Sequence, residues 1–90
     1  MIETKAILQF AKLLEGQRLV TKSHRKTFYV NVLDNALEFI PSSSGKSRKE
    51  SNKNLIKVID HFNKTRSLQS KDYHDTTYNS VYVITIIEGI

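Results

Sequence analysis

Apolar residues recur at intervals of three and four near the beginning of the chain. They would share one face of a helix, while lysine and glutamine side chains would take the opposite face. The apolar positions are Ile7, Phe10, Ala11 and Leu14. Their spacing predicts an amphipathic helix from about Thr4 to Glu15. Gly16 follows where a C-terminal cap is expected.

The pattern then changes to alternation, with residue types that favour strands. A short strand is expected at residues 18–22, and a longer one at residues 27–33 is rich in β-branched and aromatic residues. One face of the longer strand would carry Phe28, Val30 and Val32. Asp34-Asn35 predicts a hairpin turn, because both residue types tolerate left-handed conformations. A third strand at residues 36–40 would end at Pro41, which cannot donate to a sheet.

Residues 42–46 are small and polar, and they predict a loop. Ser47 and Glu50 then fit a capping box, in which the serine accepts from the backbone at Glu50 and the glutamate reaches back. Apolar residues recur after this point at helical spacing, at Leu55, Ile56, Ile59 and Phe62. We therefore expect a second helix from about Arg48 to Lys64.

The C-terminal part combines a polar stretch with an apolar run. Residues 67–79 are expected to be irregular, and residues 81–87 are rich in valine and isoleucine. Propensity slightly favours a strand for this run. A helix capped by Asn79 or Ser80 and ended by Gly89 is the alternative. The expected architecture is a single small α+β domain, in the order α-β-β-β-α followed by the apolar C-terminal segment.

Composition limits the classes of protein that this chain can represent. Ninety residues allow one small domain with a modest core. The absence of cysteine excludes disulfides and thiolate metal sites. The longest apolar run is far too short for a membrane span, and the N-terminus lacks the pattern of a signal peptide. We therefore expect a cytoplasmic protein.

The net charge of +5 is unevenly distributed along the chain. Residues 21–26 carry +3 and residues 42–57 carry +4, while the rest of the chain is net negative. If these two segments meet in space, they form one basic patch of the kind that binds a phosphate backbone. If they do not, they are two unrelated solvated surfaces.

The expected start of the second helix is the sharpest candidate site. Cations at a helix N-terminus are disfavoured by the helix dipole, so Arg48 and Lys49 would become favourable there if an anion bound. Serine hydroxyls from the preceding loop would add donors, and Lys49, Lys53 and Lys57 would continue along one helical face. The turn His24-Arg25-Lys26 is a second candidate for a phosphate contact.

These features favour a non-enzymatic nucleic-acid-binding module, with no visible base-reading motif. The expected contact residues are Lys22, His24, Arg25, Lys26, Ser43, Ser44, Lys46, Arg48, Lys49, Lys53 and Lys57. The alternative is a protein-interaction or inhibitory accessory module, in which the apolar C-terminal segment meets a protein partner or forms a homodimer.

Catalytic interpretations have little support. Gly45-Lys46-Ser47 resembles the end of a phosphate-binding loop, but the glycine that this motif needs is replaced by Ile40. Asp72, His74 and Asp75 resemble a divalent-cation site without a convincing further ligand, and a polar loop is the better interpretation. We expect no enzyme activity, no cofactor and no metal. The tyrosines at 73, 78 and 82 are expected to be half-buried packing residues.

The stretch from Gly45 to Lys53 resembles the start of the second helix in the double-stranded RNA-binding domain. That family grips phosphates across a groove with a basic segment at this position. The resemblance implies phosphate contacts by Lys46, Arg48, Lys49 and Lys53. This chain lacks the alanine-rich continuation and the Gly-Pro hairpin of that family, and residues 67–90 are additional.

A second pattern spans more of the chain and resembles small, uncharacterised bacterial or phage domains loosely associated with restriction and phage defence. It consists of Leu14-Glu15-Gly16, Thr21, Phe28, Ile40-Pro41-Ser42-Ser43, Gly45-Lys46, Arg48, Phe62, Ser67-Leu68, Tyr73, Thr77, Asn79-Ser80 and Tyr82. This resemblance implies DNA rather than RNA and a helix after Asn79. It implies no catalytic residue.

Overall fold

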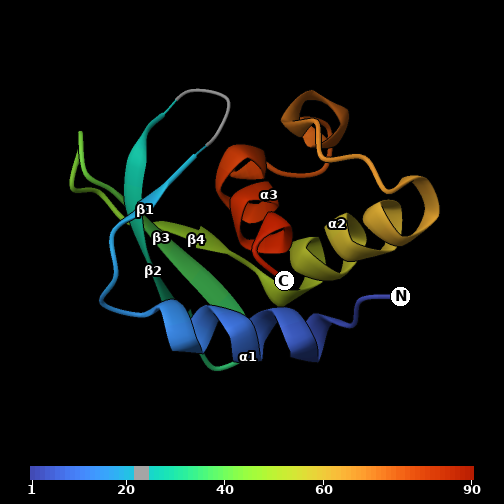
Figure 1. The fold of residues 1–90 in the computed structure, drawn as a ribbon, viewed down its shortest axis with the longest axis horizontal. Coiled ribbons are helices and arrows are strands. Elements are labelled where there is room, and N and C mark those ends of the chain that lie inside the picture. Colours follow the sequence, from blue (N-terminus) through green and yellow to red (C-terminus); the bar gives the residue numbers. More distant parts are fainter. Residues whose placement is uncertain (22–24) are drawn as a thin grey trace.

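The computed structural model describes residues 1–21 and 25–90, and it confirms a small α+β domain. The elements in chain order are α1 (Thr4–Leu14), β1 (Leu19–Val20), β2 (Thr27–Leu33), β3 (Ala36–Pro41), β4 (Arg48–Glu50), α2 (Asn52–Thr65), the 3-10 helix η1 (Ser70–Tyr73) and α3 (Ser80–Glu88) (Figure 1). Within the described part of the chain, no helix has the length and apolar character that crossing a membrane requires.

The four strands form one antiparallel sheet in the order β1-β2-β3-β4. The hairpin between β2 and β3 turns at Asp34, which has a positive φ of 56°. Phe28 and Val30 of β2 are fully buried, and so are their neighbours Leu37 and Phe39 on β3. The structure confirms the predicted first helix, the strand over residues 27–33 and the hairpin. Each was predicted from the spacing of apolar residues, which the structure places on one buried face.

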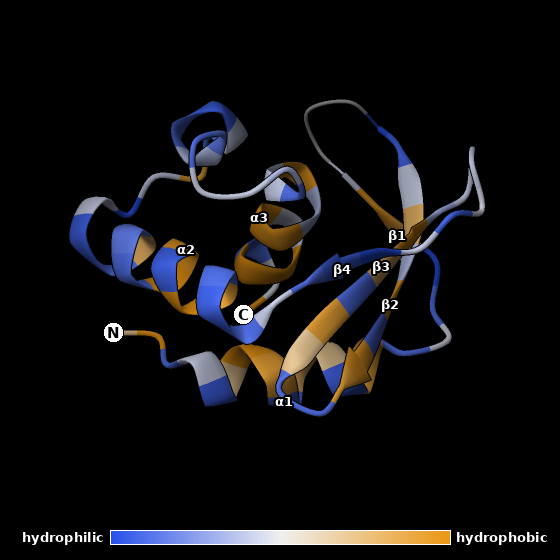
Figure 2. Ribbon diagram, turned by 180° about the vertical axis from the view of Figure 1, so that it is seen from behind, coloured by the Kyte–Doolittle hydropathy of each residue, from blue (hydrophilic) through white to orange (hydrophobic). Residues whose placement is uncertain are grey.

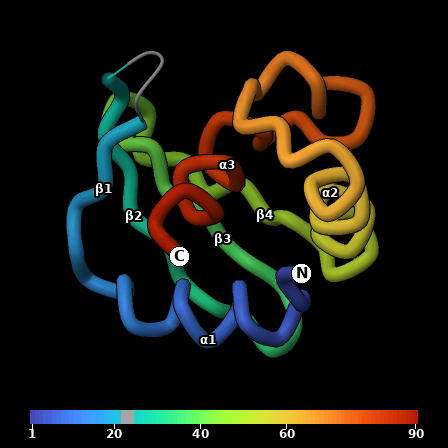
Figure 3. The backbone as a smooth tube through the Cα atoms, turned by 45° about the vertical axis from the view of Figure 1, so that its right-hand side comes forward, coloured from blue at the N-terminus to red at the C-terminus, as the bar shows by residue number. Residues whose placement is uncertain are grey.

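All three helices contribute to a core on one face of the sheet (Figures 1 and 3). Buried side chains of α1 and α2, such as Ile7 and Leu55, join the same cluster as the sheet residues. On the opposite face, Tyr29 and Leu33 remain exposed. The core therefore lies between the sheet and the helices, and the loops at the ends of the strands are accessible.

The C-terminal apolar run forms a helix, so the preference for a strand was wrong. Asn79 and Gly89 flank α3, as in the helical alternative. The run is apolar around most of its circumference because α3 is buried on most sides (Figure 2). Tyr82 packs its ring against Phe28 and Phe39, with centroids 4.8 and 5.5 Å away. Burial against the sheet explains the β-branched composition without a strand.

The predicted capping box at Ser47 and Glu50 was also wrong. Residues 48–50 form β4, which pairs with β3, and the helix starts four residues later than a capping box would place it. Ser51 is the N-cap of α2, and its hydroxyl accepts from the backbone N–H of Asn54 at 3.2 Å. Leu55, Val58, Ile59 and Phe62 form the buried face of α2. The amphipathic pattern was therefore identified correctly, but the first turn was not.

Candidate nucleic-acid interface

Described residues from both basic segments, Lys26 and the loop between β3 and β4, lie at one end of the sheet. In an antiparallel sheet, the loop that leads into β2 and the loop between β3 and β4 lie at the same end. The backbone N–H of Ser42 donates to the carbonyl of Thr27 at 3.0 Å, which ties the start of the β3–β4 loop to the first residue of β2, next to Lys26. Figure 1 shows the β3–β4 loop and the start of β2 at this end, away from the turn between β2 and β3.

A hollow of about 190 Å³ lies beside these loops, and we call it the basic hollow. Its lining residues are Lys26, Arg48, Tyr78, Val81 and Tyr82. Arg48 lies opposite the buried Phe39 in the sheet, so its side chain is on the helix-facing side. Among the described residues, no carboxylate forms an ion pair with Lys26 or Arg48. One cation from each basic segment is therefore available to the same anionic ligand.

The backbone around Lys26 is held by a buried threonine. The N–H of Thr21 donates to the carbonyl of Lys26 at 2.9 Å, and the N–H of Lys26 donates to the Thr21 hydroxyl at 3.0 Å. Thr21 is buried, so this pair of bonds is shielded from water. Lys26 therefore extends from a fixed backbone position.

The connection between β3 and β4 contributes small polar groups to the same end of the sheet. Ser43, Ser44 and Lys46 are exposed there. The N–H of Gly45 donates to the carbonyl of Pro41 at 2.8 Å, and the N–H of Lys46 donates to the Ser44 hydroxyl at 3.3 Å. The sequence predicts phosphate contacts at Ser43, Ser44 and Lys46. In the structure these residues do not line the basic hollow.

The structure places Lys49, Lys53 and Lys57 away from this hollow. Lys49 points to the opposite face of the sheet, where it lies across from Glu38. Lys53 and Lys57 are exposed on α2, whose first residue Asn52 contacts the carbonyl of Asn35 at the other end of the sheet. The predicted stripe of lysines at four-residue spacing is therefore wrong, because Lys49 is not helical. Arg25 is exposed near Lys26, and Lys22 and His24 lie outside the described residues.

The helix N-terminus at this site belongs to α3 rather than to α2. Arg48 and Lys49 precede α2 as a strand, so the predicted opposition between these cations and the α2 dipole does not occur. The first turn of α3 contributes Val81 and Tyr82 to the basic hollow. The partial positive charge at this helix end acts in the same sense as Lys26 and Arg48.

Tyr78 is a candidate site residue, and the expectation that it is a half-buried packing residue was wrong. Tyr73 and Tyr82 are buried, but Tyr78 is 96% exposed. Tyr78 also lines a second hollow of about 300 Å³, which we call the polar hollow and whose other lining residues are Asn54, His74, Asp75, Thr76 and Thr77. The sequence signal for the exposure of Tyr78 was its position in a polar stretch, outside the helical spacing of apolar residues.

Glu50 connects β4 to the segment that carries Tyr78. One carboxylate oxygen, Oε1, accepts from the Thr77 hydroxyl at 2.6 Å and from the Asn79 side-chain amide at 3.1 Å. The same amide also contacts the carbonyl of Lys49 at 3.3 Å. Glu50 is only 1% exposed, and its Oε2 has no hydrogen-bond partner among the described residues. Burial raises the pKa of Glu50, and the two hydrogen bonds oppose this shift.

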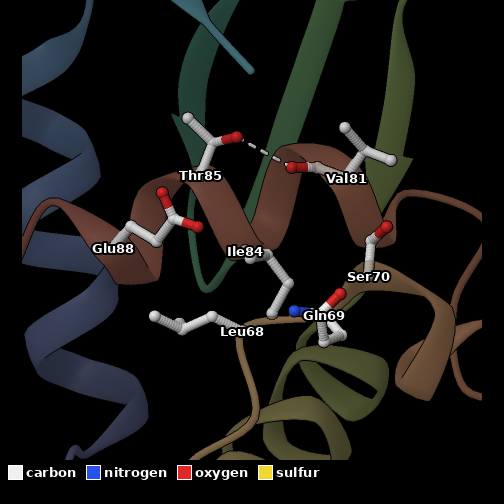
Figure 4. A pocket seen from close by; sticks show the side chains of 7 residues that line it. All are labelled: Leu68, Gln69, Ser70, Val81, Ile84, Thr85 and Glu88. Atoms are coloured by element: carbon white, nitrogen blue, oxygen red, sulfur yellow. Dashed lines mark hydrogen bonds between the residues drawn. The ribbon is translucent and has the colours of Figure 1, made fainter. Parts of the chain in front are cut away.

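Two further hollows lie away from the basic loops, and the one that contains lysines also contains the carboxylate of Asp34. Figure 4 shows a hollow of about 290 Å³ between α3 and residues 68–70, in which Leu68 and Ile84 lie near the polar side chains of Thr85 and Glu88. Another hollow of about 350 Å³ lies between α1 and the turn between β2 and β3, and it includes Lys5 and Lys12. Neither hollow includes residues of the two basic loops.

The acidic residues considered as metal ligands do not form a cluster. Asp72 accepts a hydrogen bond from the Ser67 hydroxyl, whereas Asp75 lines the polar hollow. Within residues 1–21 and 25–90, no three His, Cys, Asp or Glu side chains are placed to hold a metal ion. The geometry of these residues therefore adds no support to a divalent-cation site.

No family model matches this chain, and no curated protein or solved structure matches it significantly.

Proposed function

We propose that this protein is a non-enzymatic, cytoplasmic nucleic-acid-binding module, with DNA favoured over RNA. It would bind through the two basic loops at one end of the sheet. The observation that carries this proposal is the shared hollow of Lys26 and Arg48, which come from the two basic segments. Arg25, Lys46 and the exposed serines of the β3–β4 loop would add contacts around it.

The chemistry of the basic hollow suits a phosphate group. Arg48 supplies a planar guanidinium that can make two parallel hydrogen bonds, and Lys26 supplies a flexible ammonium group. Acidic residues are absent from both neighbouring stretches of sequence, 21–33 and 39–49. A phosphate backbone would therefore meet a local positive potential, whereas the rest of the chain is net negative.

The competing role as a protein-interaction module has a weaker basis. It relied on the apolar C-terminal segment as an accessible contact surface. In α3, however, Val83, Ile84, Ile86 and Ile87 are buried in the core of this domain. A partner could reach these side chains only if the domain opened, so this surface does not support the alternative.

The proposal is tested by fluorescence anisotropy with labelled DNA at about 50 mM and about 200 mM salt. The double variant Lys26→Ala/Arg48→Ala is expected to weaken binding about tenfold or more at the lower salt concentration. The slope of log Kd against log salt should fall by about 1.5, because two phosphate contacts are lost. Circular dichroism should show an unchanged fold, since both side chains are exposed.

The variant Lys53→Ala/Lys57→Ala is the matched control because it removes the same charge from α2. We expect its affinity to stay within about threefold of the wild type, since a distant charge acts only through screened electrostatics. Equal losses in the two variants would indicate non-specific attraction to net charge. No loss in either variant, or no binding by the wild type, would contradict the proposed function.

A further inference from the structure

We propose that this site selects single-stranded nucleic acid, with an unpaired base stacked on Tyr78 and its phosphate in the basic hollow. This inference rests on the proposed function and specifies its substrate. It combines three observations. The ring of Tyr78 is exposed, the backbone on both sides of it is held by hydrogen bonds, and Tyr78 lines two hollows of different polarity.

The exposure of Tyr78 is unusual because its neighbours in the chain are buried. Thr77 and Asn79 are both buried, and both side chains donate to Glu50. The backbone N–H groups of Thr76 and Thr77 also donate to the carbonyl of Tyr73, at 2.9 and 3.0 Å. The ring of Tyr78 is therefore presented to solvent from a fixed backbone, which lowers the ordering cost of stacking a ligand on it.

The two hollows beside Tyr78 differ in charge. The basic hollow contains Lys26 and Arg48, which attract a phosphate. The polar hollow contains the carboxylate of Asp75, which repels a phosphate but can accept a hydrogen bond from a base N–H group. Asn54 and Thr76 offer further hydrogen-bonding groups there. This difference orients a bound nucleotide, with its phosphate at Arg48 and its base edge at Asp75.

An exposed ring can stack only on a base whose face is accessible. In a duplex, each base is covered by its neighbours, so stacking on Tyr78 would require an unpaired or extruded base. Sites for single strands combine a basic groove with aromatic rings, because every base has a face that can stack. The arrangement of Tyr78 beside Lys26 and Arg48 has both parts.

The test compares Tyr78→Ala with the wild type and with Tyr78→Phe. A single strand of about 12 thymidines and a duplex of the same length are the two probes. The alanine variant should lose about fivefold to about a hundredfold affinity for the single strand and less than about twofold for the duplex. The phenylalanine variant should retain most of the affinity, because it keeps the ring.

A tryptophan at this position gives an independent readout. The chain has no tryptophan, so the fluorescence of a Tyr78→Trp variant reports on position 78 alone. Stacking of a base on the indole should quench this emission when the single strand is added and leave it nearly unchanged with the duplex. The protein remains folded in each variant, because the side chain is exposed and a surface substitution has a small effect on stability.

The outcomes distinguish the substrate from the general function. If Lys26→Ala/Arg48→Ala lowers affinity while Tyr78→Ala has no effect on either probe, nucleic-acid binding stands and the stacking proposal is overturned. Equal losses on single strand and duplex, or an equal loss in the phenylalanine variant, would also overturn it. If the wild type binds neither probe, both proposals fail.

Discussion

Replacing Ile86 with aspartate is expected to unfold the domain. Ile86 is 0% exposed and lies in α3, within the cluster that joins the helices to the sheet. The substitution removes a buried apolar side chain and places a carboxylate in an apolar cluster, at a cost above about 4 kcal/mol. Small domains have a total stability of about 5–15 kcal/mol, so most of it would be lost. Thermal unfolding followed by circular dichroism should show no cooperative transition or a strongly lowered Tm.

The control for this experiment is Leu13→Asp, which makes the same kind of change on the surface of α1. Leu13 is 74% exposed, so we expect a loss of only about 1 kcal/mol or less, mostly from helix propensity. An Ile86→Asp protein that keeps the wild-type Tm but dissociates from a dimer to a monomer would contradict the position of α3 in the core. It would also restore the interaction surface that the alternative function needs.

Glu50→Ala is expected to weaken both the fold and the binding site. The substitution leaves the Thr77 hydroxyl without its acceptor and removes one of the two acceptors of the Asn79 amide. Unsatisfied buried groups of this kind cost about 2 kcal/mol or more in total. Because these residues flank Tyr78, affinity for the single strand should fall as well. Urea unfolding and fluorescence anisotropy measure the two effects, and wild-type values for both would contradict the anchoring role of Glu50.

Glu50→Gln separates the hydrogen bonds from the charge. Burial raises the pKa of Glu50 in the folded protein, so the folded state binds this proton more tightly than the unfolded chain does. The stabilisation from the protonated group is complete below the ordinary pKa of 4.5 and declines as the pH rises through the raised pKa. Glutamine keeps an oxygen for Thr77 and Asn79 but does not ionise. We therefore expect the stability of Glu50→Gln not to fall as the pH rises through this range.

Urea unfolding of both proteins between about pH 4 and pH 8 measures this difference. The wild type should lose stability relative to the glutamine variant as the pH rises. Glu3→Gln, which replaces an exposed carboxylate, is the matched control and should follow the wild type. Parallel curves for the wild type and Glu50→Gln would show that the ionisation of Glu50 is not coupled to folding.

The elements that the sequence predicted correctly are those whose signals are local. The helix α1 follows from the periodic spacing of its apolar residues, and the hairpin of β2 and β3 follows from alternation and from the turn at Asp34-Asn35. Each element then packs its apolar face against a neighbouring element. The start of α2 depends instead on a choice between Ser47 and Ser51 as the N-cap. That choice depends on Glu50, whose side chain bonds to Thr77 and Asn79, 27 and 29 residues away. No local pattern contains this information.

The helix α3 was missed for a related reason. A run rich in valine and isoleucine is compatible with a buried strand and with a helix that is buried on most sides. The outcome depends on the available partner, which here is the face of the sheet bearing Phe28 and Phe39. The flanking residues Asn79 and Gly89 were the better signal for the bounds of this helix, although the Asn79 side chain bonds to Glu50 and to the carbonyl of Lys49 and makes no cap hydrogen bond.

The candidate site was predictable only in part. The uneven charge along the sequence identified both basic loops, and the antiparallel hairpins bring them to one end of the sheet. Lys26 and Arg48 line the same hollow because Arg48 lies in the fourth strand. The sequence reasoning assigned that strand to a helix. Tyr78 lies between Thr77 and Asn79, whose side chains bond to Glu50. Both features arise from long-range contacts.

The most direct test of the site is a titration of ¹⁵N-labelled protein with the thymidine single strand, followed by two-dimensional NMR at low salt. The account predicts that the largest shift changes occur at Lys26, at residues 43–48 and at residues 76–81. Lys53 and Lys57 on α2 should change little. Changes concentrated on α2, or spread evenly over the surface, would contradict a site formed by the two basic loops and Tyr78.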